Sequence, residues 1–263
     1  MTPTPKSPDQ SKPAQLLRVI ACEIAVREIS FAIARSRNIA DVDFLDQGYH
    51  DTPVSSRAKI QQRIDAVPAG KYDAILLGYG LCSNILVGLT ATHTPLVIPR
   101  AHDCITFFLG SKERYQQFFT SHPGSYYYTA GWLECRRRRQ RLDELLQATR
   151  MDLLPNYQEW VEKYGEDQAQ YLAEVMSGWS ENYGRGVLIS FDFAKNLGLR
   201  EQVQRLCDAR GWKFEEVEGD MRLLQRWLDG DWPDEDFQIV RPGEKVVATY
   251  DEKIIGVQPA AGV

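Results

Sequence analysis

Three cysteines each follow an apolar run that has the length and composition of a buried strand. They are Cys22 after "LLRVIA", Cys82 after the run in "YDAILLGYG", and Cys104 after "PLVIPR". Ligands of open parallel sheets bind beyond the carboxyl ends of the strands, so we expect these three thiols to face one crevice. Thiolates are soft ligands that select Zn²⁺, Cu(I) or iron–sulfur clusters. The sequence therefore predicts that Cys22, Cys82 and Cys104 are metal ligands, with burial as small hydrophobic residues as the alternative.

Acid–base side chains accompany these cysteines. His102 and Asp103 directly precede Cys104, Glu23 follows Cys22, and His50 follows the second strand-like run. Imidazole can bind a metal or carry a proton near neutral pH, and carboxylates act as acids, bases or hydrogen-bond partners of a ligand. His102, Asp103, Glu23 and His50 are the candidate catalytic residues, and both histidines are equally consistent with ordinary hydrogen-bonded loop residues.

Two glycines lie where the third strand-like run ends. Gly78 and Gly80 belong to "GYGLCSN", and glycine there lets the backbone turn sharply or approach a ligand closely. We therefore count both as candidate cofactor-binding residues. The segment does not match the dinucleotide pattern G-x-G-x-x-G, because position 83 is Ser, and the chain contains no Walker A motif.

The other two cysteines have different surroundings. Cys207 lies in the helix-like run "VQRLCDAR" and is expected to pack in the core. Cys135 begins the basic run "CRRRRQR" and is either a packing residue or a fourth ligand. The arginines Arg136–Arg139 are typical of a solvated helix face; binding of an anionic substrate or an acidic partner is the alternative.

Composition excludes several classes of protein. The 263 residues carry a net charge of −5, which gives no basic footprint for nucleic acid. No apolar run approaches the roughly 20 residues of a membrane helix. Residues 1–15 are rich in Pro, Ser and Thr without the apolar core of a signal peptide, which predicts a disordered lead and a cytoplasmic protein. Five cysteines, an odd count without an export signal, argue against a disulfide framework.

The pattern of apolar runs predicts the elements that would position these side chains. Strand-like and helix-like runs alternate, which favours an α/β fold with a mainly parallel open sheet, built from two βαβ-like halves with a helical insert. The expected divisions are 1–15, 16–132, 133–183 and 184–263. Within them we expect one helix over 103–122, an extended run over 124–133, and a hairpin or docking tail over 237–257.

Four segments give the chain a family resemblance. "ACE" at residues 21–23, "GYGLCSN" at 78–84, "PRAHDCITFFLGS" at 99–111 and "GSYYYTAGW" at 124–132 resemble the bacterial and archaeal family called domain of unknown function 1638. The resemblance covers Leu16 to Asp220. It matches Cys22, Cys82, His102, Asp103 and Cys104 to the family pattern and His50 to its H-x-x-P segment. Members often accompany corrinoid-dependent methyl-transfer proteins, and by association the resemblance implies one-carbon or thiol chemistry.

Three functional hypotheses follow. The first is a metalloenzyme in which three thiolates hold a [4Fe–4S] cluster or zinc, with an open position for a small sulfur- or methyl-bearing substrate; its site is similar to that of three-cysteine desulfidases. The second is a non-catalytic accessory protein that handles metal or corrinoid for a methyltransferase partner. The third is a metal-free enzyme with Cys104 as nucleophile beside His102 and Asp103.

Overall fold

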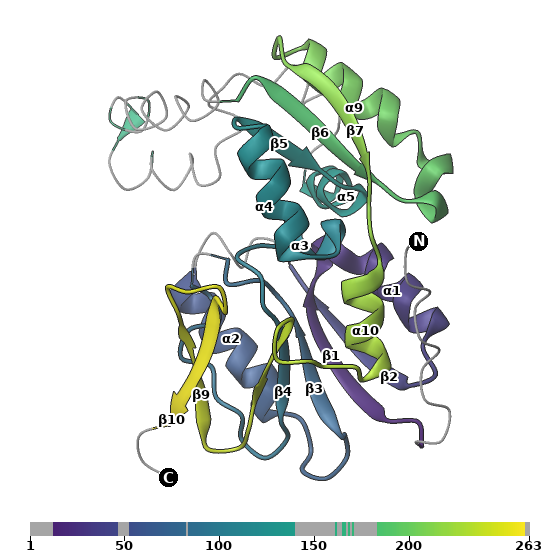
Figure 1. Cartoon of the computed structure of the whole chain (residues 1–263). Coiled ribbons are helices and arrows are strands. Elements are labelled where there is room, and N and C mark those ends of the chain that lie inside the picture. Colours follow the sequence, from purple (N-terminus) through teal and green to yellow (C-terminus); the bar gives the residue numbers. More distant parts are fainter. Residues whose placement is uncertain are drawn as a thin grey trace. The chain divides into compact units, whose positions relative to one another are not determined.

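The computed structural model describes residues 13–46, 53–82, 84–139 and 183–260, together with residues 161, 165, 166, 168 and 170. Side chains 53–55 and 136–139 lie outside this description. The chain forms two compact units (Figure 1). Unit 1 consists of Met1–Lys112 and Asp220–Val263, and unit 2 of Glu113–Gly219.

Unit 1 is built on a five-stranded sheet in the order β2-β1-β3-β4-β8. The first four strands of this order are parallel, and β8 is antiparallel to β4. The strands are β1 (Leu16–Cys22), β2 (Ile39–Leu45), β3 (Ala74–Gly78), β4 (Leu96–Pro99) and β8 (Phe237–Val240). Every residue of β3 and β4 is buried, as expected for strands covered on both faces. β1, β3 and β4, the strands that precede the three cysteines, are therefore neighbours.

Helices and a hairpin complete unit 1. The elements are the 3-10 helix η1 (Glu23–Ala25), α1 (Val26–Arg35), α2 (Pro53–Asp65), α3 (Ile105–Leu109), α10 (Arg222–Asp229) and the hairpin β9 (Glu244–Ala248)–β10 (Ile255–Pro259). α1 contacts α10, and Trp227 of α10 is fully buried with its indole N–H donating to the carbonyl oxygen of Val97 at 3.2 Å. These two helices thus cover one face of the sheet.

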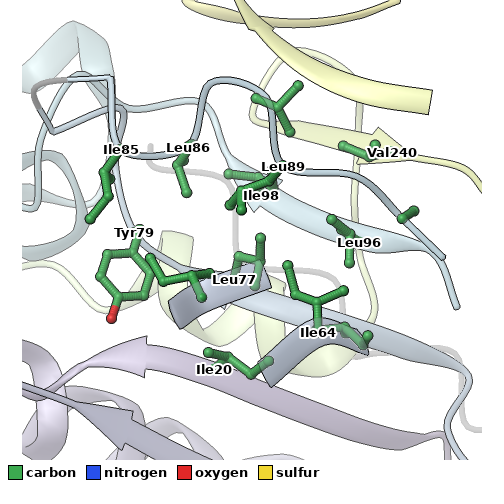
Figure 2. Close-up of a cluster of buried hydrophobic side chains, with 14 of the residues drawn as sticks. Ile20, Ile64, Leu77, Tyr79, Ile85, Leu86, Leu89, Leu96, Ile98 and Val240 are labelled. Atoms are coloured by element: carbon green, nitrogen blue, oxygen red, sulfur yellow. The ribbon is translucent and has the colours of Figure 1, made fainter. Parts of the chain in front are cut away.

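The opposite face of the sheet carries the main hydrophobic cluster (Figure 2). Alternate strand residues Ile20 and Leu77 pack there with Ile64 of α2, with the turn that follows β3, and with Val246 of β9. All four of these side chains are fully shielded from solvent or nearly so. The alternation of side chains along each strand explains how one strand can serve both faces.

Unit 2 contains a parallel three-stranded sheet in the order β5-β6-β7. Its elements are α4 (Lys112–Ser121), β5 (Ser125–Tyr128), α5 (Ala130–Arg139), β6 (Arg185–Ser190), the 3-10 helix η5 (Asp192–Leu197), α9 (Leu199–Asp208) and β7 (Lys213–Glu218). The first residue of α4, Lys112, belongs to unit 1. α9 packs on β6 and β7.

The predicted α/β fold with a mainly parallel sheet is confirmed, and three details are corrected. The helix expected over 103–122 is two helices, because Gly110 adopts a left-handed conformation (φ 80°) and ends α3. The extended run expected over 124–133 ends at Tyr128, and residues from Ala130 form α5; β5 pairs with β6 rather than with the first sheet. The C-terminal run supplies β8 to the first sheet as well as the β9–β10 hairpin.

Candidate functional site

The three predicted ligands lie at one edge of the sheet of unit 1. Cys22 is the last residue of β1, at the carboxyl end of the strand. Ala21 pairs with Gly78 in the β1–β3 register, and β3 pairs in turn with β4. Cys82 and Cys104 follow β3 and β4 by short loops on the same side. The sheet order therefore brings together the three thiols that the sequence analysis singled out.

The loops that carry Cys82 and Cys104 are hydrogen-bonded to each other. The backbone N–H of Leu81 donates to the carbonyl oxygen of Ala101 at 2.8 Å, and that of Cys82 donates to the carbonyl oxygen of His102 at 2.9 Å. The second loop then turns into α3 immediately after Cys104. This short ladder extends the β3–β4 neighbourhood beyond the strands and fixes the backbone of Cys82 against that of the following loop.

The glycines at the end of β3 allow close approaches within the chain. A Cβ on Gly78 would lie 2.5 Å from the Cβ of Ala21 and 3.1 Å from the ring of Trp227, and a Cβ on Gly80 would meet the backbone of Asp103. Both glycines therefore lie where a side chain would meet neighbouring parts of the protein. A contact of Gly78 or Gly80 with a cofactor stays a prediction.

Cys82 has a strained backbone conformation. Its φ is +37°, in the left-handed region that residues with a Cβ rarely adopt. Its amide is held by His102, and its carbonyl oxygen accepts from the backbone N–H of Ile85 at 3.2 Å. Observed strain of this kind clusters at functional sites, because the surrounding structure must maintain it.

Burial and neighbouring acids keep the three thiols protonated. Burial is the largest cause in each case: it raises the pKa of Cys22 and of Cys82 to about 12, and the pKa of Cys104 well above its usual value. The thiols also act on one another, Cys82 on Cys22 and both of these on Cys104. These mutual effects are consistent with the sheet order, which carries the three thiols to the same edge.

The charged side chains that act on these thiols are acidic. Asp103 raises the pKa of Cys82 and of Cys104, and Glu23 and Asp46 raise that of Cys22. Asp46 was not singled out from the sequence, although its position directly after β2 could have indicated it. Among the residues that the structure describes, the charged side chains that act on these thiols disfavour the thiolate forms.

Backbone N–H groups act in the opposite direction. Those of Gly80 and Cys104 lower the pKa of Cys82, and that of Ile24 lowers the pKa of Cys22. Hydrogen bonds to thiolate sulfur are among the groups that tune metal–thiolate centres. No sequence pattern indicated these donors, because they depend on the path of the backbone.

The donor set suits a soft metal, but it is not arranged as a finished coordination shell. Among the described residues, no three His, Cys, Asp or Glu side chains form a group that could hold a metal ion as they stand. Each cysteine sulfur is placed by a single torsion with three staggered positions. Ligation by the three cysteines would therefore require side-chain rotation on a backbone that already brings them together.

The predicted catalytic residues have different positions. Asp103 is half-buried and accepts from the backbone N–H of Ile105 at 2.9 Å, which orients its carboxylate at the start of α3. Glu23 begins η1 and is half-buried, and His102 is exposed. His50 lies outside the described residues, so its predicted role rests on the sequence alone.

Cys135 and Cys207 both lie in unit 2 and are buried, in α5 and α9. Cys207 packs against β6, where a Cβ on Gly186 would lie 2.3 Å from its sulfur. This position suits the packing role predicted for Cys207. The run Arg136–Arg139 continues α5, and its side chains lie outside the described residues.

A comparison with protein families gives one match. The family model covers residues 44–228 and is described as a protein of unknown function (DUF1638). The matched segment contains Cys82 and Cys104 and begins after Cys22. No match was found among curated proteins or among solved structures. Of the helices in the described part of the chain, none has the length and apolar character needed to cross a membrane.

Proposed function

The chain belongs to this family of proteins of unknown function (DUF1638), and we propose that it is a metal-dependent enzyme whose centre is held by Cys22, Cys82 and Cys104. The centre is a [4Fe–4S] cluster or zinc, and its substrate is a small sulfur- or methyl-bearing molecule. The single observation that carries the proposal is the convergence of three mutually interacting thiols at adjacent strand ends.

The electrostatics of the site support a bound cation. Three half-buried thiols beside acidic groups hold their protons at neutral pH, because desolvation of the sulfurs, and after it the neighbouring negative charges, disfavour the thiolates. A multivalent metal compensates these negative charges and releases the protons, since only thiolates bind metal well. The backbone N–H groups of Gly80 and Cys104 favour the same thiolate state of Cys82.

Three protein ligands suit either centre. Three cysteines on a [4Fe–4S] cluster would leave one iron to bind substrate as a Lewis acid, and a catalytic zinc with three protein ligands keeps its fourth position for water or substrate. With zinc, His102 is the candidate fourth ligand. Asp103, whose carboxylate is oriented by the amide of Ile105, and Glu23 are the candidate proton carriers on either side of the thiols.

Metal analysis of single variants tests the proposal. We expect the protein purified without oxygen to be brown and to contain iron and sulfide, or to be colourless with one zinc per chain. Cys22→Ser, Cys82→Ser and Cys104→Ser should each lose the metal, and Cys207→Ser, a buried cysteine of unit 2, should keep it. Retention of metal by all three site variants contradicts the proposal, as does a wild-type protein that binds neither metal after reconstitution.

Activity assays follow from the metal result. Loss of sulfide or transfer of a methyl group from small thiols and thioethers should require the metal and Cys82. A metal-bound protein that turns over none of them, but exchanges metal or corrinoid with a methyltransferase, would replace the enzyme by the accessory protein of the second hypothesis. The substrate and the corrinoid-dependent partner stay predictions.

A further inference from the structure

Arg100 occupies the position between β4 and the loop that carries Cys104. It follows Pro99, the last residue of the strand, and its backbone N–H donates to the carbonyl oxygen of Asp236 at 2.8 Å. The residue is only 2% exposed. A guanidinium this deeply buried is tolerated when its donors are satisfied, and here they are satisfied by one part of the chain.

The acceptors of Arg100 all lie in the C-terminal segment, residues 234–255. Nε donates to the carbonyl oxygen of Asp234 at 2.6 Å, and Nη2 donates to the carboxylate of Asp234 at 2.8 Å and to the amide oxygen of Gln238 at 2.9 Å. Nη1 donates to the carbonyl oxygen of Lys253 at 3.0 Å and to that of Ile255. The planar fork of arginine can serve acceptors in several directions at once, which a lysine ammonium on one flexible stem cannot reproduce.

The residues directly after Arg100 hold the loop of Cys82. The carbonyl oxygens of Ala101 and His102 are the acceptors for the amides of Leu81 and Cys82. A displacement of Arg100 therefore moves both acceptors, and with them the strained backbone of Cys82. The contacts run without interruption from the C-terminal segment through Arg100 to the two loops that carry thiols.

We propose that Arg100 is a positioning residue of the thiol site, through which the C-terminal segment sets the spacing of Cys82 and Cys104. The effect of Arg100 on metal affinity rests on the proposed function, whereas its effect on the position of the two loops does not. Arg100 does not touch the reacting groups. It acts on Cys82 through Ala101 and His102, in the way that groups behind metal ligands orient them.

Metal affinity is the first readout. Competition titration with a chromophoric chelator gives the affinity of the full-length protein for Zn²⁺ or Co²⁺. We expect Arg100→Lys and Arg100→Met to lower this affinity by roughly 10- to 100-fold at a temperature where circular dichroism shows both to be folded. If Arg100→Met fails to fold, Asp234→Asn replaces it. Asp234 is exposed, and this variant weakens only the bond from Arg100 to the Asp234 carboxylate, while the bond to the Asp234 carbonyl oxygen remains.

The matched control is Tyr72→Phe. Tyr72 is buried in unit 1 at the opposite end of β3 and donates to the carboxylate of Asp41 at 2.5 Å. Loss of the Tyr72 hydroxyl and of its hydrogen bond should lower the melting temperature without changing the affinity for metal. Equal affinity in wild type and in the Arg100 variants, or an equal loss in Tyr72→Phe, would mean that Arg100 only stabilises the unit, and would overturn the proposal.

Alkylation of the protein after chelator treatment is the second readout, and it separates the two proposals. Mass spectrometry after iodoacetamide reports each cysteine separately. We expect Cys82 and Cys104 to react several-fold faster in Arg100→Met than in wild type, because their loops open more often, and Cys22 on β1 to react at an unchanged rate. If wild type binds no metal but these rates rise, the proposed function fails and the role of Arg100 stands; if the rates are unchanged, the role of Arg100 fails.

Discussion

Gly80 and Asp103 approach each other so closely that a Cβ on residue 80 would lie 2.7 Å from the Cα of Asp103 and 2.9 Å or less from its backbone N and C. These are backbone atoms of the neighbouring loop, so no side-chain rotation can make room. The contact joins the loop of Cys82 to the loop of Cys104. Because of this contact, only glycine fits at position 80.

Gly80→Ala should therefore separate the two loops. We expect the free energy of unfolding to fall by about 1–3 kcal/mol, as for other overpacked buried positions. We also expect loss of the metal affinity described above. Urea unfolding of the full-length protein, followed by tryptophan fluorescence, checks the first result.

Gly184→Ala provides the comparison for this substitution. A Cβ at Gly184 has no neighbour within 4 Å, so the change should stay within about 0.5 kcal/mol of wild type. A Gly80→Ala protein as stable as Gly184→Ala would show that the two loops can move apart at little cost. This result would contradict the tight packing of Gly80 against Asp103.

The backbone conformation of Cys82 should lower the stability of the protein. Because its φ is +37°, we expect Cys82→Gly to be more stable than Cys82→Ala by about 1 kcal/mol, the cost of a Cβ in the left-handed region. Both variants should fail to bind metal. Chemical denaturation of the two variants after chelator treatment measures the difference.

Cys104 offers a matched test with the opposite order. Its φ is −68° and its ψ −15°, an ordinary helical conformation. Cys104→Ala should then exceed Cys104→Gly in stability by about 0.5–1 kcal/mol, because glycine loses more conformational freedom on folding. If the alanine variant were more stable than the glycine variant at both positions, backbone strain at Cys82 would be excluded.

The stability of the protein after removal of metal should fall at alkaline pH. Burial and neighbouring acids raise the pKa of Cys22 and of Cys82 from 9.0 to about 12 in the folded state. Above pH 9 the unfolded chain loses these protons while the folded chain keeps them, so deprotonation favours unfolding. The contribution is complete below pH 9 and is lost as pH rises toward 12.

Urea midpoints measured from neutral pH to about pH 10 check this expectation. In the double variant Cys22→Ser, Cys82→Ser, the decline should be shallower, because serine does not titrate in this range. A double variant whose midpoint falls as steeply as that of wild type would assign the alkaline loss to other groups.

The local pattern predicted the strands that lead to the thiols, because β1, β3 and β4 are short, largely apolar runs that end near glycine or polar residues. It did not predict features that depend on distant residues. Gly110 ends α3 where Asp220 packs against it, so closely that a Cβ would lie 2.6 Å from the Cβ of Asp220. The residues Ala130–Leu133, apolar like a strand, form the first turns of α5, and no short-range pattern distinguished the two.

The environment of the thiols was predictable only in part. Cys22, Cys82 and Cys104 were found because each follows a strand, and Asp103 and Glu23 because they are adjacent to a cysteine. The amides of Gly80 and Cys104 that lower the pKa of Cys82 could not be found in this way. The role of Arg100 was equally hidden, since its acceptors lie 134 to 155 residues further along the chain.

The distance along the chain between Arg100 and its acceptors affects the order in which the two units can form during synthesis. Unit 2 is one continuous stretch that ends at Gly219, so all of its residues are synthesised before the acceptors of Arg100. Domains generally fold as units as they emerge, and unit 1 must wait for its second stretch. The contacts of Arg100 that hold the loops of Cys82 and Cys104 therefore form only after residues 234–255 have been made, so the proposed metal centre would be completed late in synthesis.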